Sequence, residues 1–450
     1  MLASEPVNAM NEASTRFDPL LSTAPLIVYI DFKSPYAYLA KDPTLALGDE
    51  LGIEIDWRPF TLDIPSYLGS AKLDKQGRVA ESQRTDTQWK MVKGAYSDVR
   101  RYGSLRQAVV RGTIKIWDSS LAGIAMLFAK QQGITVLRSY MGITYERFWK
   151  RELDIEDIAV LEGVLAEAGA SIAGFREYAS GPGRQLHDEI QRKAFDAGIF
   201  GVPTYLVDNE MYFGREHLPR IRWILTGRRG APPDIAYEGG APMPRATAIN
   251  TALTFAFDFA SPRSYLAMKP TCALADQLGI EVDWQPLVTE APKKPKPATS
   301  ADNRGLRHRA IRAQYMERDL ARYMADRGIT LRNPSKHANS TAAAIALLWL
   351  NREAKHLARK FTELTFERYW RGELDIENES AIGRSLEEIG APTDDYETFL
   401  RSEGRAALDE TRARLNDAGL IDVPTYLVRD EAFFGREHLP LIRNRLLTSG

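Results

Sequence analysis

An internal duplication constrains this chain more than any other feature of its sequence. Residues 31–57 read DFKSPYAYLAKDPTLALGDELGIEIDW, residues 258–284 read DFASPRSYLAMKPTCALADQLGIEVDW, and 18 of these 27 positions are identical. A second block, VPTYLVDNEMYFGREHLP at 202–219, returns as VPTYLVRDEAFFGREHLP at 423–440. The offset is 227 residues in the first block and 221 in the second. Because a period of this length is far longer than a solenoid repeat, the chain is a fused pair of whole domains.

The repeat also predicts where the domains begin and end. Copy 1 covers 25–227, copy 2 covers 251–450, and the Pro- and Gly-rich stretch 228–250 between them reads as a linker. Copy 2 lacks a net six residues in the region that matches Trp57 to Asp98 of copy 1. We expect each copy to fold around its own sheet. A fused pair can also reproduce the twofold contact of a homodimer, so we expect a pseudo-dimer within one chain.

Each copy has the periodicity of an α/β domain. In copy 1, a short apolar run at 26–32 predicts a buried strand, and a helical pattern closed by Gly52 follows it. Alternation at 53–60 predicts a second strand, and strand-helix-strand order implies parallel pairing. The middle of the copy, about 80–200, has helical spacing, and two short strands then flank a turn at 208–209 before a closing helix.

Charge and cysteine content exclude several classes of function. The 59 basic and 60 acidic residues nearly cancel, so neither nucleic acid nor an anionic membrane is an expected partner. Cys272 is the single cysteine, which rules out an internal disulfide framework, a CxxC redox pair and a cysteine-rich zinc site. No HxxxH or histidine-carboxylate cluster indicates a metal either. We expect a cytoplasmic location.

The first residues carry no targeting signal that we recognise. Residues 1–24 lack a basic start followed by a long apolar core, so they do not read as a signal peptide, and we expect a loose tail. No run of about 18 apolar residues indicates a membrane span.

A Ser-Pro pair stands at the start of the first helix in both copies: Ser34 and Pro35, then Ser261 and Pro262. One interpretation is capping, because Ser is a preferred N-cap and Pro is favoured at the first helical position. The other is ligand binding. The pair sits where a parallel strand ends and a helix begins, which is where α/β proteins bind ligands and where the helix dipole favours an anion.

A Val-Pro-Thr sequence precedes the hairpin in both copies, as Val202-Pro203 and Val423-Pro424 followed by Thr. A proline that opens a strand can be cis. We expect both bonds to be cis and each to lie within about a side-chain length of the matching serine.

Three sequence stretches resemble one known family. DFKSPYAYLA, ERFWKRELDIE and AGIFGVPTYLVDNEMYFGREHL are similar to the 2-hydroxychromene-2-carboxylate isomerases, which are relatives of the kappa-class glutathione transferases and of DsbA. The resemblance covers nearly all of both copies. It implies two tandem DsbA-like thioredoxin domains, each with a helical insertion, and the predicted order of elements agrees with that plan.

The resemblance implies glutathione as a cofactor and no metal. In that family a serine replaces the first cysteine of CxxC and hydrogen-bonds the thiol of bound glutathione, so Ser34 and Ser261 are the expected catalytic residues. SPYA and SPRS hold no thiol, and disulfide exchange needs one. A hydroxyl donor at a helix N-terminus favours the nucleophilic thiolate over the thiol.

The same resemblance implies contacts with the rest of glutathione. The backbone before each cis-proline is expected to bind its cysteinyl part, and a turn after the hairpin its γ-glutamyl end. That turn reads Gly-Arg-Glu-His here in place of the family's Gly-x-Asp-Arg. The expected contacts are Val202, Pro203, Arg215 and Glu216 in copy 1, and Val423, Pro424, Arg436 and Glu437 in copy 2.

The residue after each Ser-Pro pair differs between the copies. Tyr36 in copy 1 offers an aromatic ring to an apolar substrate, whereas Arg263 in copy 2 places a cation there. We expect both to contact substrate and copy 1 to be the better catalyst. A nearby cation such as Arg263 lowers the pKa of a thiol further, but the nucleophilicity of the thiolate falls with that pKa, so the second site is expected to bind thiolate well and react less.

Other repeated residues have two interpretations each. His217 and His438 either transfer protons or belong to the turn that starts the last helix, and we favour the turn. Trp149 and Trp370 fit core packing, and Cys272 a buried small apolar residue. The pairs Asp118-Ser119 and Asn339-Ser340 are expected to be helix N-caps. Six basic residues contact either an anionic substrate or solvent: Arg106, Arg111, Lys115, Arg327, Arg332 and Lys336.

The expected function is therefore a glutathione-dependent isomerase or transferase-type enzyme that acts on a small aromatic or electrophilic substrate, and not an autonomous disulfide oxidoreductase. Two alternatives stay open. One is a non-catalytic binding or scaffold protein with a thioredoxin fold, and the other is a DsbA-family oxidoreductase relative that lacks its own CxxC.

Overall fold

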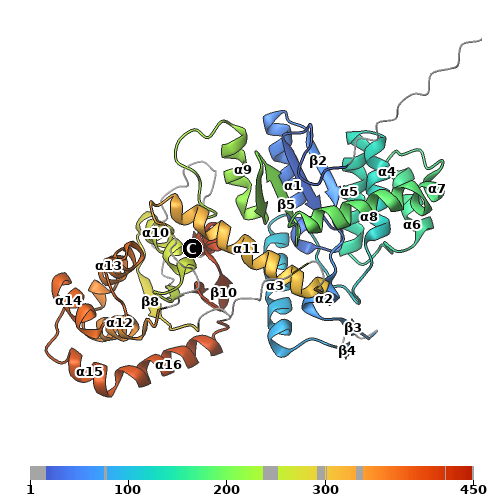
Figure 1. Ribbon diagram of the computed structural model, residues 1–450. Helices are drawn as coiled ribbons and strands as arrows, with labels where there is room; N and C mark the ends of the chain where they lie inside the picture. The colour runs from blue at the N-terminus through green and yellow to red at the C-terminus, as the bar shows by residue number, and fades with distance from the viewer. Residues whose placement is uncertain are drawn as a thin grey trace, which may run out of the picture. The chain divides into compact units, whose positions relative to one another are not determined.

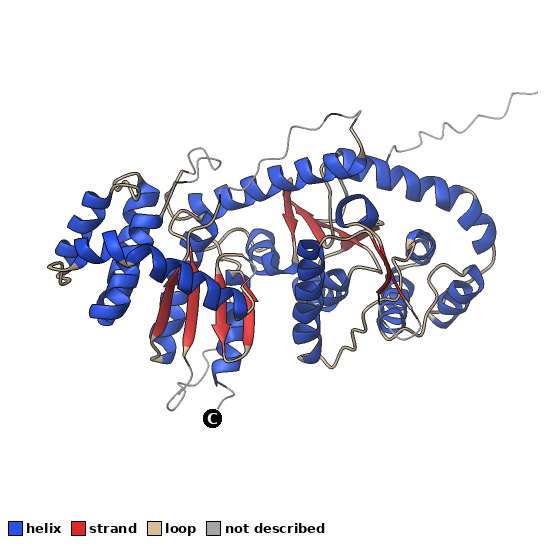
Figure 2. Ribbon diagram, turned by 90° about the horizontal axis from the view of Figure 1, so that it is seen from below, coloured by secondary structure: helices blue, strands red, loops and turns tan. Residues whose placement is uncertain are grey.

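The computed structural model describes residues 17–74, 79–236, 252–290, 299, 302–330, 338–420 and 422–447. The chain divides into two compact units, Met1–Arg215 and Glu216–Gly450. Each unit has its own four-stranded sheet, and Figure 2 shows the two sets of strands in red. The expectation that each copy folds around its own sheet is confirmed.

The first unit is a mixed sheet with helices beside it, and Figure 1 shows α4 to α8 gathered there. The sheet order is β2-β1-β5-β6, with β1 and β2 parallel and the other neighbours antiparallel. Its elements are β1 (Leu26–Ile30), α1 (Pro35–Leu51), β2 (Ile55–Pro59), α2 (Ile64–Leu68), β3 (Ala71–Leu73), β4 (Val79–Ser82), α3 (Asp86–Ser104), α4 (Ser120–Gln131), α5 (Ile134–Trp149), α6 (Ile158–Glu167), α7 (Phe175–Ser180), α8 (Pro182–Asp196), β5 (Thr204–Val207) and β6 (Glu210–Phe213).

The second unit repeats this plan with the sheet order β10-β9-β7-β8. The short helix η1 (Arg215–His217) lies at the boundary of the units. The later elements are α9 (Leu218–Leu225), β7 (Leu253–Phe257), α10 (Pro262–Leu278), β8 (Val282–Pro286), α11 (Arg304–Ala325), α12 (Thr341–Glu353), η2 (Lys355–Leu357), α13 (Ala358–Arg371), α14 (Glu379–Ile389), α15 (Tyr396–Ser402), α16 (Gly404–Asp417), β9 (Thr425–Val428), β10 (Glu431–Phe434), η3 (Arg436–His438) and α17 (Leu439–Leu447).

The strand-helix-strand start of copy 1 is confirmed. All five residues of β1 are buried, as expected for a strand that is covered on both faces. The helix α1 ends at Gly52, whose φ of 63° lies in the left-handed region that glycine adopts without a Cβ clash. The predicted hairpin turn is confirmed as well, because Asp208 and Asn209 both have positive φ, at 50° and 61°.

A proline inside α1 leaves one carbonyl of the helix without its usual donor. Pro43 has no N–H to offer the carbonyl of Leu39, four residues earlier. Arg106 takes the place of that donor, with Nη1 at 2.6 Å from the Leu39 oxygen. Copy 2 repeats the arrangement, since Arg327 donates from Nη2 to the carbonyl of Leu266 at 2.6 Å, four residues before another internal proline. This contact gives Arg106 and Arg327 a structural role that the sequence alone did not reveal.

The segment before β1 corrects one expectation. Residues 17–24 follow a defined path against β2, so the prediction of a loose tail is wrong for this part of the chain. Residues 1–16 lie outside the described residues.

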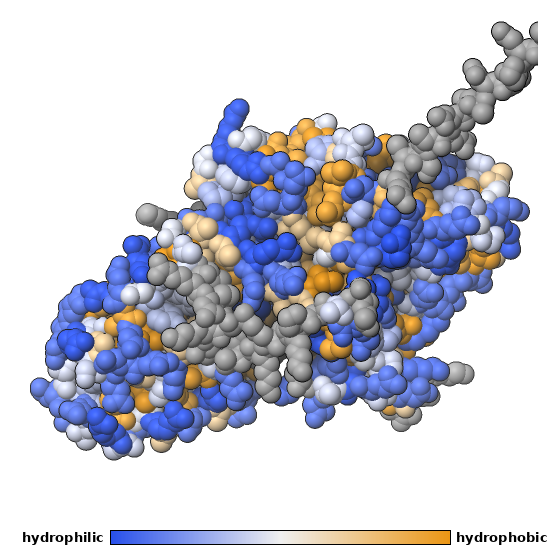
Figure 3. All heavy atoms as spheres, in the orientation of Figure 1, coloured by the Kyte–Doolittle hydropathy of each residue, from blue (hydrophilic) through white to orange (hydrophobic). Residues whose placement is uncertain are grey.

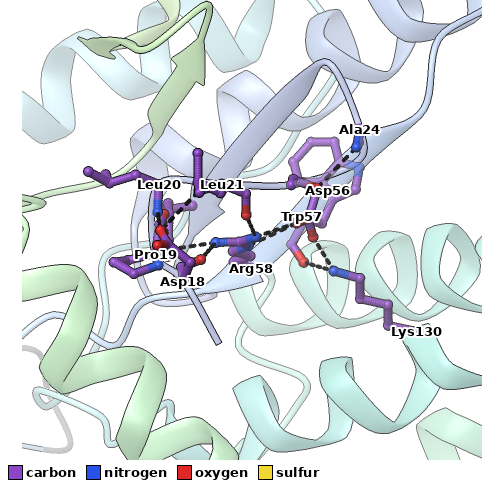
Figure 4. Close-up of polar contacts among 11 residues, drawn as sticks. Asp18, Pro19, Leu20, Leu21, Ala24, Asp56, Trp57, Arg58 and Lys130 are labelled. Atoms are coloured by element: carbon purple, nitrogen blue, oxygen red, sulfur yellow. Dashed lines mark hydrogen bonds and ion pairs between the residues drawn. The ribbon is translucent and has the colours of Figure 1, made fainter. Parts of the chain in front are cut away.

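Arg58 holds that segment in place (Figure 4). Its terminal nitrogens donate to the carbonyls of Asp18 and Leu21, both at 2.7 Å, and its side chain is buried. The Asp56 carboxylate accepts from Nε at 2.9 Å and also pairs with Lys130, so the buried charge is balanced. Arg58, a basic residue in β2, thus fixes the segment 17–24 that precedes β1.

The surface is mostly polar in the view of Figure 3, with apolar patches between the charged side chains. Among the residues described, none of the helices combines the length and the apolar character that crossing a bilayer requires.

Candidate functional site

Ser34 stands at the point where β1 ends and α1 begins. Its backbone is extended, with φ −91° and ψ 114°, and its hydroxyl accepts from the Ala37 N–H at 3.2 Å. This confirms the capping interpretation. The same hydroxyl donates to the carbonyl of Val202 at 3.4 Å, and the side chain is buried. Ser34 therefore joins the N-terminus of a helix to the chain that precedes β5.

The two Val-Pro bonds are cis, as predicted. In copy 1 the contact between Ser34 and Val202 also confirms the expected proximity of serine and Val-Pro pair. Pro203 lies directly before Thr204, the first residue of β5, and its carbonyl accepts from the N–H of Gly214 at 3.0 Å. The Val-Pro pair is thus held between the helix start and the turn after the hairpin.

The site of copy 2 differs in detail. Ser261 caps α10 in the same way, with its hydroxyl accepting from the Ser264 N–H at 3.3 Å. Within the described residues, this hydroxyl makes no bond to the Val423 carbonyl that would match the contact in copy 1.

The residue that follows the Ser-Pro pair differs between the copies, and so do its surroundings. Tyr36 and Arg263 are both half-buried. The guanidinium of Arg263 lies 3.8 Å from the Asp422 carboxylate and 5.9 Å from the ring centroid of Phe434. Asp422 therefore offsets part of the positive charge that the sequence places near Ser261.

Lys33 is a candidate that the sequence analysis missed. It precedes Ser34 directly, it is only 8% exposed, and its ammonium lies 3.9 Å from the Asp31 carboxylate. Copy 2 has Ala260 at this position. Comparing DFKSP with DFASP was the signal, because it reveals a lysine directly before the serine in copy 1 and an alanine there in copy 2.

Asp31 and Asp258 were also missed, although both copies carry an aspartate at this place. Asp31 is buried and accepts from the N–H groups of Lys33 at 3.1 Å and Leu62 at 2.8 Å. Asp258 is fully buried and accepts from both the N–H and the hydroxyl of Thr289, at 2.7 and 2.6 Å. Each carboxylate fixes the loop that carries the serine.

The predicted N-caps of the next helices are only partly correct. Asp118 and Asn339 do accept from the N–H groups of Ser120 and Thr341, at 2.9 and 3.1 Å. The serine hydroxyls expected to help do not cap. Ser340 instead donates to the buried Asp258 at 2.6 Å, because an ionised acceptor is a stronger partner than a helix N–H.

The Gly-Arg-Glu-His turns place one arginine of each copy on an aromatic ring. Arg215 lies 3.8 Å from the ring centroid of Tyr102, and Arg436 lies 4.9 Å from that of Tyr323. Both turns begin with a glycine of positive φ, and at Gly435 a Cβ would collide with the side chain of Glu437. Glu216 follows Arg215 in η1.

The histidines of these turns are buried and contact aromatic side chains. His217 is the N-cap residue of α9, it is buried, and its Nδ1 lies 2.8 Å from the Tyr323 hydroxyl. Burial lowers its pKa, and the charge of Arg322 acts in the same direction against that of Asp319. His438 is buried against Phe433. The favoured interpretation, a turn before the last helix, is confirmed.

Several remaining candidates are also structural. Trp149 is fully buried, and Trp370 packs against Tyr265 at 5.9 Å between ring centroids. Cys272 is a free, buried thiol, and burial together with a hydrogen bond to Glu363 raises its pKa to about 12. The thiol is therefore protonated and unreactive near neutral pH.

The other basic positions do not converge on the serine. Lys115 pairs with Glu156 at 2.6 Å, and Arg111 donates to the Lys150 carbonyl at 3.3 Å. Arg332 and Lys336 lie outside the described residues. Over the described ranges, His, Cys, Asp and Glu side chains form no group able to hold a metal ion.

Curated proteins and solved structures include relatives that each match a little under half of this chain. One curated relative, a 2-hydroxychromene-2-carboxylate isomerase from Sphingobium xenophagum, is 26% identical over 198 residues, which cover 43% of this chain and 97% of that protein. Another of the same name from Pseudomonas putida is 26% identical over 193 residues, 43% of this chain and 92% of its own. A solved 2-hydroxychromene-2-carboxylate isomerase aligns with a TM-score of 0.35 and 24% identity over 43% of this chain and 94% of that one.

The family match resolves the fold. A DSBA-like thioredoxin domain matches the chain twice, over residues 25–225 and 252–447. Each match contains one sheet with its helices, which confirms the predicted fold class. The chain therefore belongs to the DSBA-like thioredoxin domain family, as a tandem pair of such domains.

Proposed function

We propose that this protein is a glutathione-dependent isomerase or transferase-type enzyme that acts on a small aromatic or electrophilic substrate, with Ser34 at its reactive centre. The observation that carries the proposal is the position of the Ser34 hydroxyl, which lies buried at the N-terminus of α1 and 3.4 Å from the carbonyl before a cis-proline. The curated relatives named as isomerases support the class of reaction.

A thiol bound at this point would ionise easily, and three local features favour the thiolate. The N-terminus of a helix stabilises a nearby anion by about 0.3–1 kcal/mol at an exposed site and up to about 2 kcal/mol when partly buried. A hydroxyl that donates to a charged sulfur adds about 1.5–3 kcal/mol. Lys33, which directly precedes Ser34 in the chain, adds a positive charge to this loop, and its ammonium lies 3.9 Å from the Asp31 carboxylate. Since one pKa unit is worth about 1.4 kcal/mol, these effects lower a thiol pKa by roughly two units.

When bound, glutathione would supply a reversible thiolate nucleophile for a conjugated double bond or for an electrophile that carries a leaving group. The Ser34 hydroxyl would hold the thiolate at the N-terminus of α1, and the backbone of Val202 before the cis-proline would orient it.

The copies would contribute unequally to this chemistry. Copy 1 has the hydroxyl contact to Val202, the lysine beside the serine and the aromatic Tyr36. Copy 2 has Ala260 and Arg263 at the corresponding places, and Asp422 shares the charge of Arg263. Copy 1 is therefore the proposed catalytic site, and copy 2 a site that binds thiol but reacts less.

The test is Ser34→Ala, assayed with glutathione and 2-hydroxychromene-2-carboxylate or a generic electrophile. Loss of a hydroxyl bonded to a charged sulfur should lower kcat/KM about tenfold to a hundredfold. The pKa of bound glutathione, followed by the ultraviolet absorbance of the thiolate, should rise in parallel, which a purely structural role of Ser34 would not cause. An unchanged rate with an unchanged thiol pKa would refute the proposal.

A further inference from the structure

The segment at the end of the second strand is fixed differently in the two copies. In copy 1 this segment covers residues 59–62, and the N–H of Leu62 donates to the Asp31 carboxylate at 2.8 Å. In copy 2 the matching Thr289 donates to Asp258 from both its N–H and its hydroxyl, at 2.7 and 2.6 Å. Because leucine has no hydroxyl, position 62 binds its aspartate through the backbone alone.

Copy 1 has its threonine one residue earlier, and this threonine contacts a helix. Thr61 Oγ1 lies 3.0 Å from Nε2 of His187 on α8. The N–H of Thr61 also donates to Oε1 of Gln191 at 2.8 Å, and Nε2 of Gln191 donates to the carbonyl of Pro59 at 3.2 Å. In copy 1 the side-chain anchor of the segment therefore lies on α8 and includes a histidine.

The surroundings of His187 leave room for its ring. His187 is 2% exposed, and Gly123 of α4 lies beside it. A Cβ at position 123 would lie 3.3 Å from Cδ2 of His187 and 3.0 Å from Cβ of Pro59, which is tighter than ordinary contact. Copy 2 differs at the positions that match Thr61, His187 and Gly123, where it has Val288, Leu408 and Ala344. The polar pair and the glycine that accommodates it therefore change together between the copies.

The charges around His187 decide how its ring is protonated. Its Nδ1 lies 3.2 Å from the Asp188 carboxylate, and since an ionised carboxylate only accepts, Nδ1 donates and Nε2 accepts from the Thr61 hydroxyl. Burial lowers the pKa of His187, and the charge of Arg184 on the same helix acts in the same direction. The hydrogen bond and charge of Asp188, and the charge of Asp118 before α4, act against this lowering of the pKa. The segment 59–62 itself carries no charged side chain.

We propose that His187 is a positioning residue of copy 1, whose neutral ring holds the segment 59–62 and whose protonation releases it. The released segment carries the N–H that binds Asp31, three residues before Ser34, so the loop at the start of α1 loosens with it. Copy 2 has Val288 and Leu408 at these places and lacks the titratable contact. This goes beyond the proposed function, since neither a thiol nor a substrate takes part.

The test is hydrogen exchange of the full-length chain, followed by mass spectrometry at about pH 7.5 and about pH 5.5 and corrected for the intrinsic pH dependence of exchange. A released histidine has a pKa of about 6.5 and binds a proton that the buried ring resists, so release becomes easier as the pH falls. The peptide that covers 59–62 should therefore exchange about threefold to tenfold faster at the lower pH. The peptide that covers 286–289 is the internal control and should keep its rate.

Two variants separate the histidine from other causes. The triple substitution Thr61→Val, Gly123→Ala and His187→Leu introduces the residues of copy 2 together, so the space around the ring stays filled. His187→Gln keeps a polar side chain beside Thr61 but cannot bind a proton in this pH range. Both variants should lose the pH dependence of the 59–62 peptide, whereas His356→Gln on the exposed η2 should keep it.

Three results would overturn the proposal. The first is an unchanged exchange rate of the 59–62 peptide in the wild type. The second is equal acceleration of the two peptides, which would place the effect outside copy 1. The third is a wild-type pH dependence in His187→Gln while circular dichroism shows a folded chain, and this variant decides if the triple variant does not fold. No thiol takes part, so a failure of the glutathione chemistry leaves these outcomes unchanged.

Discussion

Asp258 shows how one buried side chain fixes the loop beside a site. Among the described residues, its carboxylate accepts from the Ala260 N–H, from both donors of Thr289 and from the Ser340 hydroxyl. An amide has one acceptor oxygen in place of two, so Asp258→Asn leaves a buried donor unpaired and brings an NH₂ group against others.

We therefore expect Asp258→Asn to lower the free energy of unfolding by about 2–3 kcal/mol. Urea unfolding followed by circular dichroism measures the change. Asp409→Asn is the control, because Asp409 is exposed on α16 and its substitution should cost less than about 0.5 kcal/mol. If both substitutions lowered the free energy of unfolding equally, the hydrogen bonds to the buried Asp258 carboxylate would not contribute to stability beyond those of an exposed aspartate.

His217 predicts a dependence of stability on pH. Its folded-state pKa is lowered by burial, whereas an unfolded histidine has a pKa of about 6.5. Below that pH the unfolded state binds the extra proton and the folded state resists it, so unfolding becomes easier as the pH falls.

The expected result is a urea midpoint of the second unit that decreases from about pH 7 to about pH 5, with a smaller decrease in His217→Gln. His356→Gln on the exposed η2 is the control, and it should keep the slope of the wild type. A His217→Gln variant with the wild-type slope would assign the pH dependence to other groups.

Single residues were predictable where the two copies agree and the chemistry is local. The capping role of Ser34 follows from its place before a proline at a helix start, and the cis-prolines follow a motif present twice. Asp258 was not found, because its partner Ser340 is 82 residues away and only the fold brings them together. Asp234, whose carboxylate accepts from Nε of Arg436 at 2.7 Å, was not found either, since a Pro- and Gly-rich segment predicts exposure and gives no sign of such a contact.

At the scale of elements, the helix α1 lacks one backbone hydrogen bond, and a side chain from another segment replaces it. The carbonyl of Leu39 loses its donor at Pro43 and gains Arg106. Arg106→Met should therefore lower the free energy of unfolding by about 1–2 kcal/mol, because it leaves that carbonyl unpaired.

In a Pro43→Ala background the helix supplies its own N–H, so the same Arg106→Met change should cost about 1 kcal/mol less. The coupling in this double-mutant cycle is the measurement. Arg101→Met serves as the control, since Arg101 pairs with Asp98 on α3 and should show no coupling to Pro43. If the changes in the free energy of unfolding at positions 43 and 106 simply added, Arg106 would not replace the donor that Pro43 lacks.

The regular elements were largely predictable and the irregular ones were not. Buried strands and amphipathic helices repeat with periods that sequence alone displays, which is why β1, α1 and β2 were found. The short α2, β3 and β4 were missed, because three to five residues are too few to show a period. The ordered segment 17–24 was missed because its anchor, Arg58, satisfies backbone carbonyls that no side-chain pattern marks.

At the scale of the whole molecule, duplication allows one copy to change while the other keeps its role. The prediction is unequal sensitivity to the same substitution. Ser34→Ala should remove most activity toward a conjugated substrate. Ser261→Ala should mainly weaken thiol binding, because the described residues of copy 2 show no contact that matches the one between Ser34 and the Val202 carbonyl.

Steady-state rates and glutathione titrations on the two variants separate these effects. Equal losses of kcat/KM from both substitutions would contradict the asymmetry, and no loss from either would leave Ser34 as a helix cap only.

The attachment of Asp234 to the chain affects the ion pair that it forms. Its carboxylate accepts from Nε of Arg436 at 2.7 Å, and only a short stretch separates Asp234 from Leu225, the last residue of α9. A tethered group acts at an effective concentration that depends on the tether, in the millimolar range for short flexible connections, and not on the amount of protein present. This ion pair is therefore insensitive to dilution of the protein.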